Sequence, residues 1–132
     1  MTENAGEAAS LYERLGGAPG LLTYVDSFYE IMSADTATES IWAMHKRDLP
    51  DLKARLAAFL SGFVGGPVVY PQRYGAPMMR ARHLAFPIGQ QARDLWLSCA
   101  YRAIAASFSD RQAALEFARA LTAFADHMRN VD

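Results

Sequence analysis

Apolar residues recur along the chain at steps of three and four, the spacing that places side chains on one face of an α-helix. Between residues 19 and 32, Leu21, Val25, Phe28 and Met32 follow these steps. The neighbouring rows of this segment are apolar as well, so we expect a largely buried helix. The same pattern predicts three more long helices, which start near residue 50, near residue 90 and near residue 110.

Capping and stop residues divide these helices from short linking segments. Ser10 with Glu13 three residues later predicts a capping box, and Gly16-Gly17 ends the short helix 11–15 that follows. Ser109 is expected to cap the last helix. The stretch 68–77 shows no helical periodicity and is predicted as a long loop, which in a compact domain is usually functional. A short helix over 78–85 follows it.

The chain has 132 residues and contains no alternating strand pattern and no internal repeat. These features predict an all-α protein with one domain over residues 11–132 and a flexible N-terminal head over residues 1–10. A content of 52% hydrophobic and 20% charged residues excludes a disordered chain.

The charges nearly balance, with 13 basic and 14 acidic residues. A net charge of −1 gives no reason to expect nucleic acid as a partner. The first residues lack the pattern of a signal peptide, and no apolar run reaches the length of a membrane span, so we expect no membrane partner. Cys99 is the single cysteine, which excludes an internal disulfide, and we expect a cytoplasmic protein.

Common catalytic motifs for nucleotides, acyl transfer and metalloprotease chemistry are missing from the sequence. Cys99 lies in the middle of a predicted helix, which favours a small buried hydrophobic residue over a nucleophile. The three histidines, His45, His83 and His127, have no local metal-ligand spacing, so a three-histidine zinc site has little support. His127 is expected on a solvated face beside Asp126.

His83 has the most suggestive surroundings of the three. Met79 lies four residues before it and therefore on the same helix face, while Arg80 and Arg82 flank it. An imidazole on an apolar face between guanidiniums suits an amphiphilic metal macrocycle such as haem. A surface histidine in an arginine-rich turn is the alternative, and spacing alone favours that alternative.

A family resemblance adds to this reading of the residues. The segments that carry it are FYEIM at 28–32, FLSGFVGGPVVY at 59–70, YGAPMMRARHLAFPIG at 74–89 and RDLWLSC at 93–99. They resemble the truncated haemoglobins of the second group, and so do LYERLGG at 11–17 and ADHMRN at 125–130. The resemblance covers almost the whole chain.

This resemblance implies a globin-like two-over-two α-helical sandwich around haem b. His83 stands at the position of the proximal iron ligand, Tyr29 at that of the distal tyrosine, and Trp96 at that of the tryptophan that marks this group. His45 falls at the aromatic-or-histidine position before the helix that starts near residue 50. The other residues that we expect to line the haem pocket are Phe28, Leu52, Leu56, Phe59, Tyr70, Met79, Arg80, Arg82, Phe86 and Ile88, with Arg82 as a propionate partner.

Each distal assignment has a structural alternative. Tyr29 could reach the rim of the molecule, Trp96 could be a core residue, and His45 could be exposed at a helix end. The chain also departs from the family at Ala76, where a histidine is common, and at Pro87.

The resemblance implies reversible binding of dioxygen, carbon monoxide and nitric oxide at pentacoordinate-type iron. Donors from Tyr29, Trp96 and His45 would stabilise the partial negative charge of bound dioxygen and slow its release, which suits scavenging, storage or sensing. A redox enzyme for nitric oxide dioxygenation or peroxide chemistry, with an external reductase, is the alternative. A haem-free helical interaction module is a third reading. We expect a monomer or a weak dimer.

Overall fold

The computed structural model describes residues 9–45 and 48–131, and every regular element in these ranges is helical. The elements are α1 (Leu11–Arg14), α2 (Gly17–Ala34), the 3-10 turn η2 (Thr36–Thr38), α3 (Glu39–Trp42), α4 (Leu49–Phe63), α5 (Tyr70–Tyr74), α6 (Met79–His83), α7 (Gln90–Ser107) and α8 (Arg111–Met128). Most of the predicted flexible head lies outside the described residues, so the domain boundaries stay a prediction.

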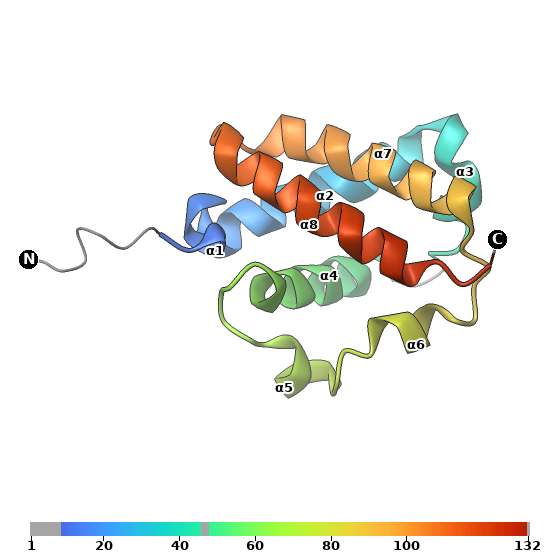
Figure 1. The fold of residues 1–132 in the computed structure, drawn as a ribbon, viewed down its shortest axis with the longest axis horizontal. Coiled ribbons are helices and arrows are strands. Elements are labelled where there is room, and N and C mark those ends of the chain that lie inside the picture. The colour runs from blue at the N-terminus through green and yellow to red at the C-terminus, as the bar shows by residue number, and fades with distance from the viewer. Residues whose placement is uncertain (1–8, 46–47, 132) are drawn as a thin grey trace, which may run out of the picture.

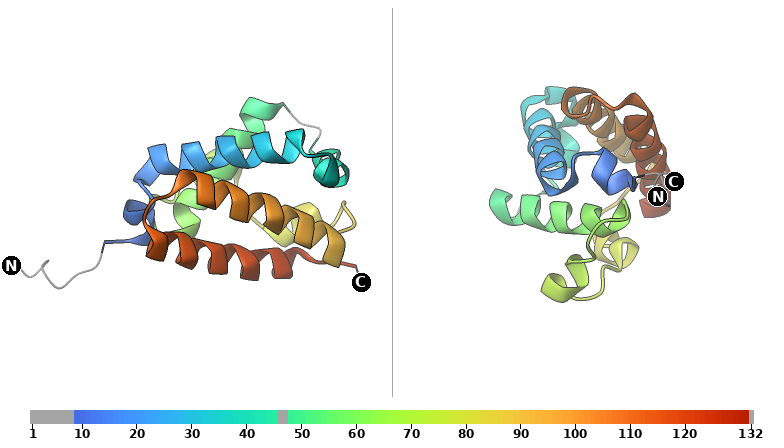
Figure 2. Two further views of the ribbon diagram at one scale, coloured as in Figure 1. Left: turned by 90° about the horizontal axis from the view of Figure 1, so that it is seen from above. Right: turned by 90° about the vertical axis from the view of Figure 1, so that its left-hand side faces the viewer.

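The four long helices form the body of the molecule. Helix α2 packs against both α4 and α7, and α7 in turn packs along α8 (Figures 1 and 2). The predicted stripe of α2 is confirmed, because Leu21, Val25, Phe28 and Met32 are all buried. None of the helices in the described ranges is long and apolar enough to cross a membrane.

Aromatic rings fill the centre of this body. The Tyr24 ring lies 5.9 Å from that of Phe28, 6.0 Å from that of Phe108 and 5.1 Å from that of Phe117, measured between centroids. Tyr24, Phe28 and Phe117 are essentially inaccessible to solvent. Burial of this much aromatic surface is a main source of stability, and it fixes α2 against α7 and α8.

Side-chain caps set the helix ends. The predicted capping box at Ser10 and Glu13 is confirmed, with both of its reciprocal hydrogen bonds present. The prediction that Ser109 caps the last helix is wrong. Asp110 takes that position, because the helix begins one residue later than predicted, at Arg111, and the Asp110 carboxylate accepts a hydrogen bond from the Ala113 amide at 3.0 Å.

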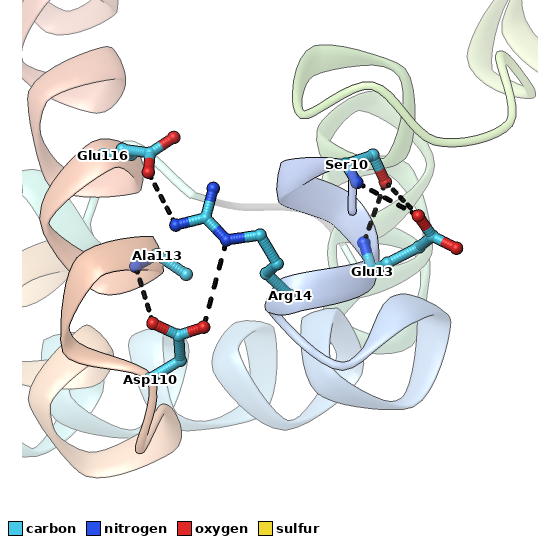
Figure 3. Close-up of polar contacts among 6 residues, drawn as sticks. All are labelled: Ser10, Glu13, Arg14, Asp110, Ala113 and Glu116. Atoms are coloured by element: carbon cyan, nitrogen blue, oxygen red, sulfur yellow. Dashed lines mark hydrogen bonds and ion pairs between the residues drawn. The ribbon is translucent and has the colours of Figure 1, made fainter. Parts of the chain in front are cut away.

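Helix α1 is tied to the start of α8 by charged groups (Figure 3). The Arg14 guanidinium donates to Glu116 Oε2 at 2.6 Å and lies 3.9 Å from Asp110 Oδ2. The link from α1 to α2 is equally tight, because a Cβ atom on Gly20 would lie only 1.9 Å from the Leu15 carbonyl oxygen. This close approach requires glycine.

The segment between α4 and α7 differs from the prediction. The stretch 68–77 is not a continuous loop, because Tyr70–Tyr74 form the short helix α5 with Pro71 in its first turn. Five residues are too few to show helical periodicity in the sequence. Helix α6 is also shorter than predicted: Met78 precedes it with φ of 41°, and Asn130 donates to the carbonyls of His83 and Phe86 where the helix ends.

Candidate functional site

A cavity of about 390 Å³ lies among α2, α4, α6, α7 and α8. Its volume falls in the ordinary range of small-molecule and cofactor sites, and apolar side chains predominate in its wall. All the site residues expected from the sequence line this cavity except Arg80. They are Phe28, Tyr29, His45, Leu52, Leu56, Phe59, Tyr70, Met79, Arg82, His83, Phe86, Ile88 and Trp96.

Tyr29 projects from the buried face of α2 into the cavity wall. The side chain is 5% exposed, and its hydroxyl makes no hydrogen bond to the described part of the chain. Burial raises the pKa of Tyr29 to about 12, so the hydroxyl keeps its proton at neutral pH. The hydroxyl oxygen is not sealed off, because the buried side-chain oxygen or nitrogen without a partner in the described ranges is Ser107 Oγ. Tyr29 therefore has an O–H donor available at the cavity.

Trp96 lines the cavity from α7. Its ring lies 5.3 Å from Phe28 and 6.3 Å from Phe124, so packing fixes the orientation of the indole. The indole N–H is a donor only, and no acceptor in the described ranges takes it. Two unpartnered donors, one from α2 and one from α7, therefore belong to one cavity wall.

His45 completes this wall next to α3. Its ring contacts Tyr29 edge to face at 5.7 Å and stacks on Trp42 at 6.1 Å. His45 Nδ1 lies 2.8 Å from the Ile41 carbonyl oxygen. Because a carbonyl only accepts, Nδ1 carries a proton and donates it, which leaves Nε2 as the lone-pair nitrogen of the neutral ring.

The charge state of His45 follows from its surroundings. Burial lowers the pKa of His45, the hydrogen bond to Ile41 opposes this effect, and the charge of His83 lowers the pKa further. The imidazole is therefore neutral at neutral pH. Its Nε2 can accept a hydrogen bond in that state and becomes a donor only when it is protonated.

His83 lies across the cavity on α6. Its Nδ1 lies 2.6 Å from the carbonyl oxygen of Met79, one turn earlier in the same helix. The same reasoning makes Nδ1 the donor and leaves the Nε2 lone pair without a partner among the described residues. An imidazole whose Nδ1 proton is held by a backbone carbonyl has the tautomer and the fixed ring of a metal ligand.

Arg82 reaches the cavity but also organises the loop before α6. Its Nε donates to the Pro77 carbonyl at 2.6 Å, and its Nη2 donates to the Tyr74 and Ala76 carbonyls at 3.3 and 3.0 Å. These three bonds hold the loop at Ala76. Arg82 Nη1 has no hydrogen-bond partner in the described ranges, and the guanidinium lies 5.8 Å from the ring of Tyr70, another residue of the cavity wall.

Arg80 is the one expected residue that the structure does not bring to the cavity. Its guanidinium is exposed and turns toward the end of α8, where Nη2 lies 3.4 Å from the Arg129 carbonyl oxygen. Met79 and His83 are four residues apart and share the inner face of α6, whereas Arg80 is rotated about 100° from Met79.

Sequence reasoning missed several residues of the cavity wall. They are Ile41, Met44, Arg55, Ala92, Arg93, Phe124, Ala125 and Met128. A signal existed for Arg55, because it follows Leu52 by three residues and so neighbours Leu52 on the helix surface. No local signal marks the α8 residues, since only the tertiary structure places α8 over this cavity.

The remaining candidate residues lie elsewhere. Cys99 is fully buried in the core, and burial raises the pKa of its thiol, as expected of a structural cysteine. His127 is exposed on α8, as predicted. In the described ranges, no three histidine, cysteine or acidic side chains come together in a way that could hold a metal ion.

Comparison with known proteins places these observations in a family. Residues 10–130 match the family described as "Bacterial-like globin". The chain is 39% identical over 88 residues to "Group 2 truncated hemoglobin YjbI" of Bacillus subtilis, an alignment that covers 67% of this chain and 64% of that relative. The chain thus spans less than two thirds of the length of this curated relative.

Two solved structures are similar over nearly their whole length. The group II 2-on-2 haemoglobin of Agrobacterium tumefaciens matches with a TM-score of 0.90 and 33% identity, covering 97% of this chain and 99% of that one. The truncated oxygen-avid haemoglobin of Bacillus subtilis matches with a TM-score of 0.82 and 33% identity, covering 92% and 100%.

The helical body and the cavity are therefore those of a globin, and the chain belongs to the bacterial-like globin family. Within it, the chain falls among the truncated haemoglobins of the second group, and the predicted two-over-two helical fold is confirmed. Membership implies a haem group and small gaseous ligands such as oxygen.

Proposed function

We propose that the cavity holds haem b and that the protein reversibly binds dioxygen and other diatomic ligands, with slow release. One observation carries the proposal. A histidine nitrogen with a free lone pair and two unpartnered donors, Tyr29 O–H and Trp96 N–H, line the same largely apolar cavity. Haem iron, when bound there, supplies the reversible binding of the diatomic ligand.

The residues present fit this group. His83 Nε2 is the nitrogen that would bind the haem iron, because the Nδ1 proton is already donated to the Met79 carbonyl. Phe59, Met79 and Phe86 supply apolar surface for the porphyrin faces. The wall also contains the cations Arg55 and Arg82, which suit the two carboxylates of haem b. Arg82 Nη1 is the group best placed to take part in such a pair.

The distal side accounts for slow release. A bound diatomic ligand with partial negative charge is stabilised best by hydrogen-bond donors whose orientation is fixed in advance. Ring contacts with Phe28 already fix the side chains of Tyr29 and Trp96. Neutral His45 carries no proton on Nε2, so at neutral pH it adds no third donor to those of Tyr29 and Trp96. The solved Bacillus subtilis relative is described as oxygen-avid, which agrees with this proposal.

Absorption spectra of the purified full chain test the cofactor and its ligand together. Ferric, ferrous and carbonyl forms should each give the Soret band of a histidine-ligated haem. His83→Ala should lose most of the haem at neutral pH and melt at a lower temperature, because a ligated cofactor stabilises the folded state.

His127→Ala is the matched control, since His127 is exposed on α8 and does not line the cavity. It should keep the wild-type spectrum and haem content. A colourless wild-type protein, or full haem occupancy in His83→Ala, would contradict the proposal. An external reductase, a monomeric or weakly dimeric state and a cytoplasmic location stay predictions from the sequence.

A further inference from the structure

Acidic and basic residues are distributed unevenly along the chain, although the net charge is close to zero. Between Asp51 and Asp94 the sequence has six cationic residues and no carboxylate, while the rest of the chain has seven cationic and fourteen acidic residues. The basic segment contains α5 and α6, which lie along one edge of the molecule outside the four long helices (Figures 1 and 2). The segment that contains α5 and α6 therefore has a net positive charge, and the rest of the chain has a net negative charge.

The six cations divide into two groups of three. Lys53, Arg55 and Arg93 pair with Asp26, Asp51 and Asp126 respectively. Arg73, Arg80 and Arg82 are exposed, and none of them pairs with a carboxylate in the described ranges. A solvated arginine surface without local acidic partners retains its positive field for a partner of opposite charge.

Apolar side chains are exposed on the same segment. Met78 is 65% exposed, Leu84 56% and Phe86 38%. Arginine, methionine and aromatic residues are enriched at protein interfaces, and lysine is depleted there. We call Arg73, Met78, Arg80, Arg82, Leu84 and Phe86 the α5–α6 surface. Its composition favours an acidic protein over a polyanion, which would need no apolar contact.

The position of the α5–α6 surface indicates what kind of acidic protein it receives. Arg82 and Phe86 are exposed and also line the cavity, and His83 lies between them on the same short segment. A partner seated here would touch the wall of the cavity. Short separation between donor and acceptor is what electron transfer needs, and weak, small, charge-guided contacts are typical of redox encounters.

We propose that the α5–α6 surface docks an acidic electron-donor protein of the ferredoxin type. The proposal rests on the haem proposed above. In the step it serves, a reduced [2Fe–2S] cluster gives up one electron and is oxidised, and the ferric haem iron gains that electron and becomes ferrous. No bond is made or broken and no proton is required.

Binding to an oxidised, acidic plant-type [2Fe–2S] ferredoxin tests the surface without any redox change. Calorimetry on the full chain should show binding that weakens as salt is raised, because the contact is between exposed charges. Arg73→Gln with Arg80→Gln should weaken binding by about 3- to 20-fold at low salt, as expected for two exposed charge contacts. Neither residue lines the cavity, so the Soret band should not change.

Arg111→Gln with Arg119→Gln is the matched control, because it removes the same charge from exposed positions of α8. Equal weakening in the control, or wild-type affinity in the α5–α6 variant, would overturn the proposal. So would binding to anionic phospholipid vesicles but not to ferredoxin, or a salt-sensitive dimer that the α5–α6 variant abolishes. Calorimetry measures ferredoxin binding whether or not the protein contains haem. The Soret band tests haem binding by itself, so failure of the haem proposal is distinguished from failure of the docking proposal.

Discussion

The two walls of the cavity are held in place by different forces. The wall that contains Tyr29 and Trp96 is built on long helices, and six residues of α2 and five of α7 are fully buried. The opposite wall stands on α6, a five-residue helix that buries none of its residues. Hydrogen bonds to backbone carbonyls from Arg82, His83 and Asn130 hold that wall instead.

This difference shows how one small domain can combine a rigid and an adaptable side. Packing fixes the direction of the distal donors before any ligand arrives, which is what electrostatic stabilisation requires. The α6 side has few buried apolar contacts and is expected to open locally at low free energy. Its order should therefore depend on the group that His83 ligates, whereas the order of α2 should not.

The largest expected effect is on the packed wall. Phe28→Ala removes a buried ring that contacts Tyr24, Tyr29 and Trp96, so the free energy of unfolding should fall by about 3–5 kcal/mol. Urea unfolding monitored by circular dichroism measures this loss. Leu84→Ala, at an exposed position next to α6, should change the same quantity by less than about 0.5 kcal/mol. An equal loss of unfolding free energy in Phe28→Ala and Leu84→Ala would contradict the view that packing stabilises the α2 wall more than the α6 wall.

The distal donors should control release rather than folding. Tyr29→Phe and Trp96→Phe each remove one donor worth about 1.5–3 kcal/mol, so each should speed dioxygen release by about 10- to 150-fold. Stopped-flow measurement of release should show non-additive effects in the double variant, since both donors share one acceptor. Carbon monoxide release should change less, because that ligand carries little charge.

One variant controls for loss of a hydroxyl. Tyr101→Phe removes the hydroxyl of an exposed tyrosine on α7 that does not line the cavity. It should release dioxygen at the wild-type rate. Unchanged release in Tyr29→Phe and Trp96→Phe would mean that these side chains do not meet the ligand.

Asn130 tests the hydrogen-bonded wall. Its side chain donates to the carbonyls of His83 and Phe86 at 3.1 and 2.8 Å and accepts from the Ile88 amide at 2.9 Å. Asn130→Ala should lower the free energy of unfolding by about 1–3 kcal/mol. Hydrogen exchange should quicken mainly at residues 83–88, while α2 stays protected. Val131→Ala, at the exposed neighbouring position, should leave the exchange pattern unchanged.

The smallest expected effect is the pH response of His45. Because burial lowers the pKa of the folded-state imidazole below its ordinary 6.5, the unfolded chain binds this proton first as the pH falls. The stabilisation is therefore complete above about pH 6.5 and is lost as the pH falls through the folded-state pKa. Protonation also turns Nε2 into a donor, so dioxygen release should slow in the same range.

His45→Phe keeps the bulk of the ring and removes the titration. Its unfolding free energy and its release rate should lose the pH dependence that the wild type shows below pH 6.5. Tyr29 is not an alternative source, since its pKa of about 12 lies far from this range. An identical pH profile in the wild type and in His45→Phe would assign the titration to another group.

The sequence by itself determined the long helices, because periodic apolar residues must be buried together and their spacing leaves one face for each helix. It also pointed to His83 as the iron ligand through the family resemblance, whereas spacing alone favoured a surface histidine. Helix α5 was not predicted, because a single turn without a capping motif shows no periodicity; in the structure the Arg55 guanidinium lies over its Tyr74 ring at 4.4 Å.

Only the tertiary structure decided which groups share the cavity and in what state. No local sequence pattern predicts that Phe124 and Met128 of α8 line one side of the cavity. Nor does one predict that Arg80 turns away from the cavity while Arg82 lines it. The direction of the His45 pKa shift also depends on packing, because burial of the imidazole is its largest cause. Periodicity selects the buried face of a helix, whereas the neighbours of that face are fixed by how the helices cross.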